Sequence, residues 1–381
     1  MREFEELMRY AWENGAAVER FIENNQLCTQ IIQKAQSLED ISYHNGGNAA
    51  LMGMKFLSQG ADVLLGGAVG EHTKPLLPPN IRIANQEGHD EIHLILEFSR
   101  GERWGELTAP RDNRLIVHCD YTNSRLNVLE EFHSALASFQ PELVVITGVH
   151  LLEREDPSFR TKRLQTIVSE IKKVNKEAPV HFELASNSDI GFISEVGSTI
   201  LPHVDSLGLN EQELGYLYAS LGGTKVAKSS VPKYVKKHFK EPKVQTISNA
   251  IAFIFNKIKP ATREFSRIHF HYLKYHIVAQ RKGSRWVPGK KSVVIGSMIA
   301  SIQSCVFSDI QKLDELFFVP FSSETSTLEA VRFWEEQGIE FYLSPVLVCK
   351  SPKKTVGLGD AISATGLLYH QQQTSQTKKV Q

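Results

Sequence analysis

The stretch TVGLGDAIS, residues 355–363, places a carboxylate directly after a glycine-rich turn. Gly357 and Gly359 let the backbone approach a ligand closely and adopt positive φ, and the apolar run after Asp360 indicates a helix that begins there. The free N–H groups and the positive dipole end of such a helix start bind anions. A carboxylate beside an anion site suits the deprotonation of a hydroxyl that receives a phosphoryl group. An ordinary junction with Asp360 as the N-cap fits this stretch alone equally well.

A second glycine pair precedes another helical stretch, in HNGGNAALMGMKFLSQG. Gly46, Gly47 and Asn48 could present backbone N–H groups and one amide to a polyol. A simple helix start capped by Asn48 is the better interpretation of this stretch alone.

Two carboxylates follow apolar strand-like runs. His181 and Glu183 in HFE share one face of a strand, and Asn210 and Glu213 in GLNEQE lie on one side of a starting helix. Such carboxylates could hold Mg²⁺ through water, because Mg²⁺ prefers oxygen ligands and keeps several waters. Glu213 could equally be the capping-box partner of Asn210.

Other catalytic patterns do not occur in the sequence. It contains no GxxxxGK[ST] phosphate loop, no GxSxG elbow and no HExxH metal pair, and GLGDAISATG does not match GxGxxG. His269 and His271 alternate along RIHFHYL, which favours core or substrate-edge positions.

The composition is that of a globular protein with one large or two modest domains: 381 residues, 41% hydrophobic and 23% charged. Because 43 basic and 43 acidic residues balance, no net field argues for nucleic acid or a membrane surface as a partner. The longest apolar stretches are of strand length, so we expect no transmembrane segment. The spacing of the cysteines favours free buried thiols over a zinc site and leaves one disulfide open: Cys28, Cys119, Cys305 and Cys349.

Short apolar strands alternate with helical periodicity, which predicts a parallel α/β sheet with ligands at the carboxyl ends of its strands. The predicted strands are DVLLGGAVG, ELVVITGV, PVHFELAS, VDSLGLN and RIHFHYL, and residues 158–176 form a predicted helix. Residues 81–121 alternate polar and apolar side chains, which predicts a half-exposed antiparallel lid. The polar C-terminal residues 371–381 are predicted to be disordered.

These motifs, in this order, resemble those of the ADP-dependent glucokinases of the ribokinase-like superfamily, nearly end to end. The matching blocks include GGNAALMGMKF, HLILEFSRGERWGELTAP, VHFELAS, SLGLNEQEL and PVLVCKSPKKTVGLGDAIS, the last two being close to the animal branch. The resemblance implies a three-layer α/β/α sandwich over residues 1–80 and 122–370, with a β-rich lid over 81–121.

The resemblance also implies a reaction, in which MgADP and D-glucose give AMP and glucose 6-phosphate. It makes Asp360 the base on the sugar hydroxyl, and the backbone from Gly357 to Asp360 the anion hole. One magnesium ion, held largely through waters, would lie near Glu183, Glu213 and Asp360. The remaining implied roles are sugar contacts for Gly46, Gly47, Asn48, Glu97 and His150, phosphate contact for Arg114, and adenine contact for Val346, Leu347 and Val348.

Several departures and alternatives accompany this resemblance. Family members carry an earlier core strand that this sequence lacks, so we expect the chain as written to be destabilised and to bind glucose poorly. A phosphofructokinase-like kinase is disfavoured by Glu97, and a non-catalytic sugar- or nucleotide-binding protein remains an alternative. We expect a monomer. Since no signal peptide is present as written, the default is cytoplasmic, whereas animal family members resemble endoplasmic-reticulum or secreted proteins.

Overall fold

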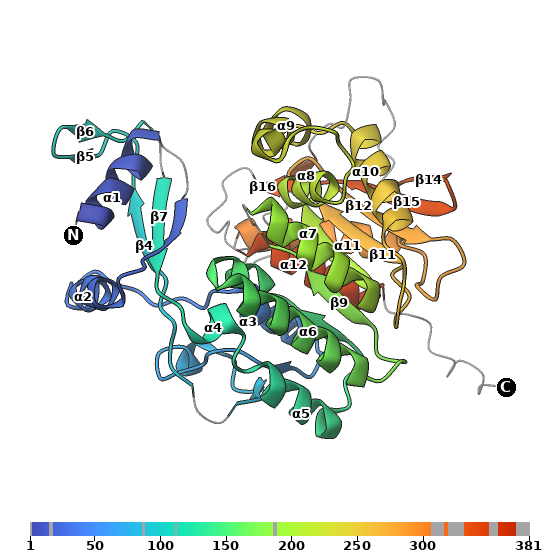
Figure 1. The fold of residues 1–381 in the computed structure, drawn as a ribbon, viewed down its shortest axis with the longest axis horizontal. Coiled ribbons are helices and arrows are strands. Elements are labelled where there is room, and N and C mark those ends of the chain that lie inside the picture. The colour runs from blue at the N-terminus through green and yellow to red at the C-terminus, as the bar shows by residue number, and fades with distance from the viewer. Residues whose placement is uncertain are drawn as a thin grey trace. The chain divides into compact units, whose positions relative to one another are not determined.

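A computed structural model describes residues 2–14, 18–85, 88–110, 113–185, 189–305, 316–318, 331–349 and 357–370. The chain forms two compact units, each assembled from separate segments (Figure 1). Unit 1 comprises Met1–Asn45, Gly67–Leu77 and Asn85–Val128, and unit 2 comprises Gly46–Gly66, Pro78–Ala84 and Leu129–Gln381.

Unit 2 is built on a seven-stranded sheet with the order β14-β15-β12-β11-β10-β9-β8. The strands β8 to β11 are mutually parallel, which confirms the predicted parallel α/β sheet, and β12, β15 and β14 continue it in antiparallel fashion. Their bounds are β8 Val144–Ile146, β9 Val180–Glu183, β10 Ser206–Asn210, β11 Arg267–His271, β12 Tyr275–Arg281, β14 Arg332–Glu336 and β15 Ile339–Pro345.

The central strands of this sheet are buried along nearly their whole length, because helices cover both of its faces. The helices α3, α11 and α12 contact one another, and α6 to α10 form a second contacting group, of which α6, α7 and α8 are green in Figure 1. The helix predicted over 158–176 is α6. The bounds are α3 Asn48–Ser58, α5 Leu129–Phe139, α6 Pro157–Lys173, α7 Ile190–Thr199, α8 Glu211–Ser220, α9 Val231–Phe239, α10 Val244–Lys257, α11 Lys290–Cys305 and α12 Leu358–Leu368.

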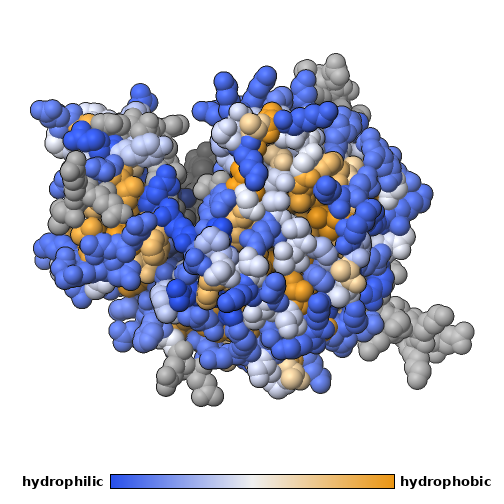
Figure 2. Space-filling model, in the orientation of Figure 1, coloured by the Kyte–Doolittle hydropathy of each residue, from blue (hydrophilic) through white to orange (hydrophobic). Residues whose placement is uncertain are grey.

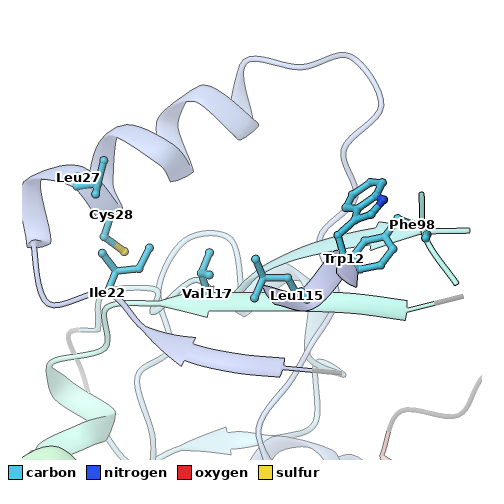
Figure 3. Close-up of a cluster of buried hydrophobic side chains, with 9 residues drawn as sticks. Trp12, Ile22, Leu27, Cys28, Phe98, Leu115 and Val117 are labelled. Atoms are coloured by element: carbon cyan, nitrogen blue, oxygen red, sulfur yellow. The ribbon is translucent and has the colours of Figure 1, made fainter. Parts of the chain in front are cut away.

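Unit 1 is a three-stranded sheet with the order β1-β7-β4, in which β7 pairs parallel with β1 and antiparallel with β4. One sheet face is covered by a hydrophobic cluster that includes Trp12, Ile22 and Phe98, drawn in Figure 3. Cys28 and Cys119 form a disulfide within this unit. The bounds are α1 Arg2–Asn14, β1 Val18–Phe21, α2 Asn25–Gln36, β4 Leu94–Phe98, β5 Arg103–Trp104, β6 Leu107–Thr108, β7 Asn113–His118 and α4 Thr122–Arg125.

Several expectations differ from this architecture. Residues 1–45, expected in the large domain, belong to unit 1 because β1 pairs with β7 and α1 packs on it. DVLLGGAVG contributes only β2 Leu64–Leu65, which pairs with β3 Arg82–Ile83 apart from the seven-stranded sheet. The expectation of free thiols is wrong, since none of the described cysteines is free. The predicted disordered tail lies outside the described residues.

Hydrophilic residues cover most of the face drawn in Figure 2, with apolar side chains between them. Within the described part of the chain, none of the helices combines the length and the apolar character that crossing a membrane requires.

Candidate active site

Two helices that begin at glycines meet in unit 2. Gly357 is the N-cap of α12 with φ 73°, and Gly47 is the N-cap of α3 with φ 77°. Both φ values lie in the left-handed region, which glycine adopts without steric cost. A Cβ on Gly357 would also lie 2.9 Å from Cδ1 of Leu51 in α3. The close approach of the two helix starts therefore requires a glycine at position 357.

The side chains just inside these two helix starts bond to each other. Nδ2 of Asn48, the first residue of α3, donates a hydrogen bond of 2.9 Å to Oδ1 of Asp360 in the first turn of α12. Neither helix has a side-chain cap, so the simpler interpretation of Asn48 and Asp360 as N-caps is wrong. The structure thus joins a predicted sugar contact to the predicted base.

Asp360 is a stronger base than an ordinary aspartate. Burial, and secondly the negative charge of Glu183, raise the pKa of Asp360 to about 6, against the lowering effect of the hydrogen bond from Asn48. The carboxylate therefore remains largely ionised at neutral pH, yet accepts a proton more readily than an exposed aspartate does.

Glu183, at the carboxyl end of β9, is held from several sides. His181 Nε2 lies 2.7 Å from Oε2, and Ser363 of α12 donates a 2.9 Å hydrogen bond to Oε1. Although burial alone would raise it, the contacts with His181 and His271 lower the pKa of Glu183 to about 2. Glu183 is therefore a fixed negative charge that attaches α12 to the sheet.

Glu213 forms the capping box that the sequence left as an alternative. Asn210 Oδ1 accepts from the Glu213 backbone N–H at 2.9 Å, and the Glu213 carboxylate accepts from the Asn210 backbone N–H at 2.9 Å. Burial raises the pKa of Glu213 to about 8. A bound cation would lower this raised pKa, because a nearby positive charge favours the ionised carboxylate.

His271, for which the sequence predicted only a core or substrate-edge position, also belongs to this group. It ends β11 opposite Asn210, and its Nε2 lies 3.5 Å from Oε1 of Glu183. Burial alone would lower its pKa, but Glu183, Glu213 and Asp360, in that order, raise the pKa of His271. His271 thus lies among three carboxylates whose negative charge favours its protonated form. Its alternation with His269 on a strand was the available signal.

A buried polar network extends from this group along the same sheet face. His181 Nδ1 lies 2.8 Å from Ser206 Oγ, which accepts a 2.9 Å hydrogen bond from Arg267. Arg267, fully buried, also donates from Nε to His370 Nδ1 at 2.7 Å, just beyond α12. The network therefore contacts α12 at Ser363, in its middle, and at His370, just beyond its end, and single-sequence patterns gave no sign of it.

The other predicted positions in unit 2 lie on separate elements. His150 is in η2 Val149–Arg154, directly after β8. Val346 donates its N–H to Lys274 O at 3.2 Å, and β16 Leu347–Cys349 follows. The side chain of Val348 lies outside the described residues. The ligand roles of these residues stay predictions.

Glu97 and Arg114, the predicted lid residues, are direct neighbours in unit 1. They face each other across the antiparallel pair of β4 and β7. The alternate residues Leu96, Leu115 and Phe98 point to the opposite face, where the hydrophobic cluster lies. Glu97 and Arg114 therefore occupy the sheet face that this cluster does not cover, and Glu97 is exposed.

Comparison with known proteins places this arrangement in a family. Residues 1–369 match the conserved region of ADP-specific phosphofructokinases and glucokinases. The ADP-dependent glucokinase of Bos taurus is 38% identical over 385 residues, covering 96% of this chain and 76% of the relative. The chain belongs to the ADP-specific phosphofructokinase/glucokinase family. A probable ADP-dependent glucokinase of Caenorhabditis elegans is 33% identical, with coverages of 94% and 75%.

Solved structures agree with the fold of this ADP-specific family. An ADP-dependent kinase in complex with fructose 6-phosphate and ADPβS has a TM-score of 0.72 at 19% identity, covering 97% of this chain and 88% of that one. A hypothetical ADP-dependent phosphofructokinase from Pyrococcus horikoshii OT3 has a TM-score of 0.73 at 18% identity, with coverages of 96% and 86%. The predicted α/β class is confirmed at the level of the fold.

Proposed function

We propose that the chain transfers the terminal phosphoryl group of ADP to the 6-hydroxyl of D-glucose, giving AMP and glucose 6-phosphate. The observation that carries this proposal is the Asn48–Asp360 hydrogen bond, which places a carboxylate with a raised pKa between two glycine-capped helix starts. The choice of ADP and glucose rests on the two animal relatives named above, which are glucokinases by name.

Asp360 acts as the general base. Its carboxylate accepts the proton of the sugar hydroxyl as that oxygen forms its bond to phosphorus and the bond to the AMP leaving group breaks. The Asn48 amide fixes the orientation of Oδ1, so that the second carboxylate oxygen is available to the hydroxyl. The Gly46–Gly47 turn leads directly into this amide, which suits the predicted contacts with the sugar.

The start of α12 stabilises the transferred phosphoryl group. The first N–H groups of a helix have no acceptor within the helix, and the dipole adds positive potential there. The left-handed Gly357 lets the chain turn into this helix, and Gly359 leaves room for His271, whose Cε1 would lie 3.1 Å from an added Cβ. In its protonated form, which the neighbouring carboxylates favour, His271 would add positive charge on the sheet side of the same group.

The carboxylates fit a divalent cation, which would be Mg²⁺ in this proposal. Glu183, Glu213 and Asp360 place three carboxyl groups around His271, and burial raises the pKa of two of them, Glu213 and Asp360. Glu213 and Glu183 would hold the ion largely through waters, near Asp360. When bound, the ion would neutralise charge on the phosphates.

We propose that Glu97 binds a sugar hydroxyl and Arg114 binds the nucleotide phosphates. His150 and the backbone of Val346, Leu347 and Val348 are proposed for sugar and adenine respectively. Each role predicts a specific kinetic signature: loss of Glu97 should raise the KM for glucose, whereas loss of Arg114 should raise the KM for ADP.

The test is an enzyme-coupled assay for glucose 6-phosphate on the 381-residue chain with Mg²⁺, comparing ADP with ATP. Asp360→Asn is the matched control, because it keeps the shape of the side chain and removes the base. Turnover with ADP alone, abolished in D360N, supports the proposal, and turnover with ATP alone contradicts the donor. Fructose 6-phosphate as the better acceptor would select the phosphofructokinase alternative, and ADP binding without any turnover would select the non-catalytic one.

Two further expectations concern the state of the protein. The Cys28–Cys119 disulfide favours an oxidising compartment over the cytoplasmic default, because disulfides persist there. Immunolocalisation in the native cell tests this proposal. We also propose that the chain is a monomer, which size-exclusion chromatography with light scattering tests.

A further inference from the structure

A second cluster of metal-ligating side chains lies in unit 1, at one end of the pairing between β4 and β7. The last paired residues there are Leu94 and Val117. Continuing the antiparallel register by one position places His93 opposite His118, on the face that also carries Glu97 and Arg114. The hydrophobic cluster of Figure 3 lies on the other face, with Leu115 and Val117.

The two imidazole rings stack, with centroids 4.3 Å apart and an interplanar angle of 16°. Both rings direct a nitrogen to the carboxylate of Asp120, which follows β7. His93 Nε2 lies 2.8 Å from Oδ2, and His118 Nδ1 lies 3.4 Å from Oδ1. One ligand atom from each residue falls within 4.8 Å of the others, and among the described residues this is the one such group of three.

A separate observation, the hydrogen bonding of the buried atoms, also points to a ligand at this group. Nδ1 of His118 and Oδ1 of Asp120 are both buried; they contact each other at 3.4 Å, and neither makes a hydrogen bond. The exposed fractions of the two residues are only 8% and 5%. Buried polar atoms nearly always make hydrogen bonds, so two buried atoms that meet only at 3.4 Å without one call for an explanation. The His93 side chain, 32% exposed, provides the access to solvent.

Surrounding contacts keep Asp120 and His118 in place. The carboxylate of Glu91 accepts hydrogen bonds from the backbone N–H groups of Tyr121, Thr122 and Asn123, directly after Asp120. Phe21 packs its ring against His118 with centroids 5.6 Å apart. Outer contacts of this kind orient metal ligands in proteins.

We propose that His93, His118 and Asp120 form a binding site for a divalent transition metal, with Zn²⁺ the best match. Two neutral imidazole nitrogens and one carboxylate oxygen suit Zn²⁺, and the exposed side leaves a position for water. Mg²⁺ is a poor match because it prefers oxygen ligands. The ion would join the residue before β4 to the loop after β7, beside the Cys28–Cys119 disulfide.

The experiment measures metal binding by the purified full-length chain, produced without a histidine tag and stripped with EDTA. Zn²⁺ affinity is measured by competition with a chromophoric chelator, and Co²⁺ is added in parallel as a spectroscopic probe. Four variants are compared: His93→Gln and Asp120→Asn in the site, His238→Gln as a solvent-exposed histidine control, and Asp360→Asn as a control for the proposed magnesium group.

The wild-type chain, H238Q and D360N should each bind one equivalent of Zn²⁺ that millimolar Mg²⁺ does not displace. Co²⁺ should give visible d–d absorption of a low-coordinate site with nitrogen ligands. H93Q and D120N should weaken Zn²⁺ binding at least about tenfold. Since His93 is partly exposed, H93Q keeps the test valid even where D120N fails to fold. Unchanged affinity in H93Q, loss of the equivalent in H238Q or D360N, or no stoichiometric binding by the wild type would each overturn the proposal.

Discussion

Replacing Asn48 by alanine tests the hydrogen bond on which the proposed function rests. The Asn48 amide donates to Oδ1 of Asp360 at 2.9 Å and thereby favours the charged carboxylate. A hydrogen bond to a charged group contributes about 1.5–3 kcal/mol, and one pKa unit corresponds to about 1.4 kcal/mol. Removing the donor should therefore raise the pKa of Asp360 by about one to two units, from about 6 to about 7–8.

A base loses activity below its pKa, so the acid limb of the activity profile should move to higher pH in N48A. At pH 7 the ionised fraction of Asp360 should fall about two- to tenfold, and activity should recover near pH 9. The assay is kcat/KM for glucose from pH 5.5 to 9.5, with Asn256→Ala on the exposed side of α10 as the control. An acid limb at the wild-type pH, with KM raised equally at all pH values, would refute the reasoning and leave Asn48 a sugar contact only.

Two further substitutions test groups beside Asp360, and reduction of a disulfide tests unit 1. Burial raises the pKa of Glu213 to about 8, so the free energy of unfolding should fall as pH rises from 4.5 to 8. In E213Q this pH-dependent fall should be smaller by up to a few kcal/mol. Thermal melts with EDTA at pH 6 and 8.5 measure the difference. The Cβ added by Gly208→Ala would lie 2.0 Å from Oε2 of Glu183. We therefore expect the free energy of unfolding to fall by about 1–3 kcal/mol and activity to fall roughly tenfold. A melting temperature of G208A equal to that of the wild type would contradict this. Reducing Cys28–Cys119 should lower the unfolding free energy by about 2–4 kcal/mol, with hydrogen exchange rising first in unit 1.

Local sequence predicted the elements of the candidate site better than their contacts. The continuous apolar runs predicted the buried parallel strands, because period and burial are properties of a few neighbouring residues. The glycines before Asp360 and Asn48 predicted helix starts for the same reason. The local patterns could not reveal that these two starts meet, since their hydrogen bond joins residues 312 positions apart.

The misplaced segments have a common physical cause. The sequence pattern of an amphipathic N-terminal helix is the same whichever sheet the helix covers. Only the pairing of β1 with β7, on which α1 packs, assigns it to unit 1. The disulfide likewise depends on the approach of Cys28 and Cys119 from distant segments, which spacing does not encode. Arg267 and His370 look like ordinary polar residues until the sheet and α12 bring them together.

The interleaving of the two units has a consequence for the order of events during synthesis. Every segment of unit 1 lies within the first 128 residues, so both Cys28 and Cys119 leave the ribosome long before α12 is made. The helix α3 is also made early, yet its buried Met52 packs on Ala364 and Leu367 near the end of the chain. We therefore expect the nascent chain to close its disulfide early while carrying an uncovered apolar helix through most of translation, a surface that chaperones would recognise.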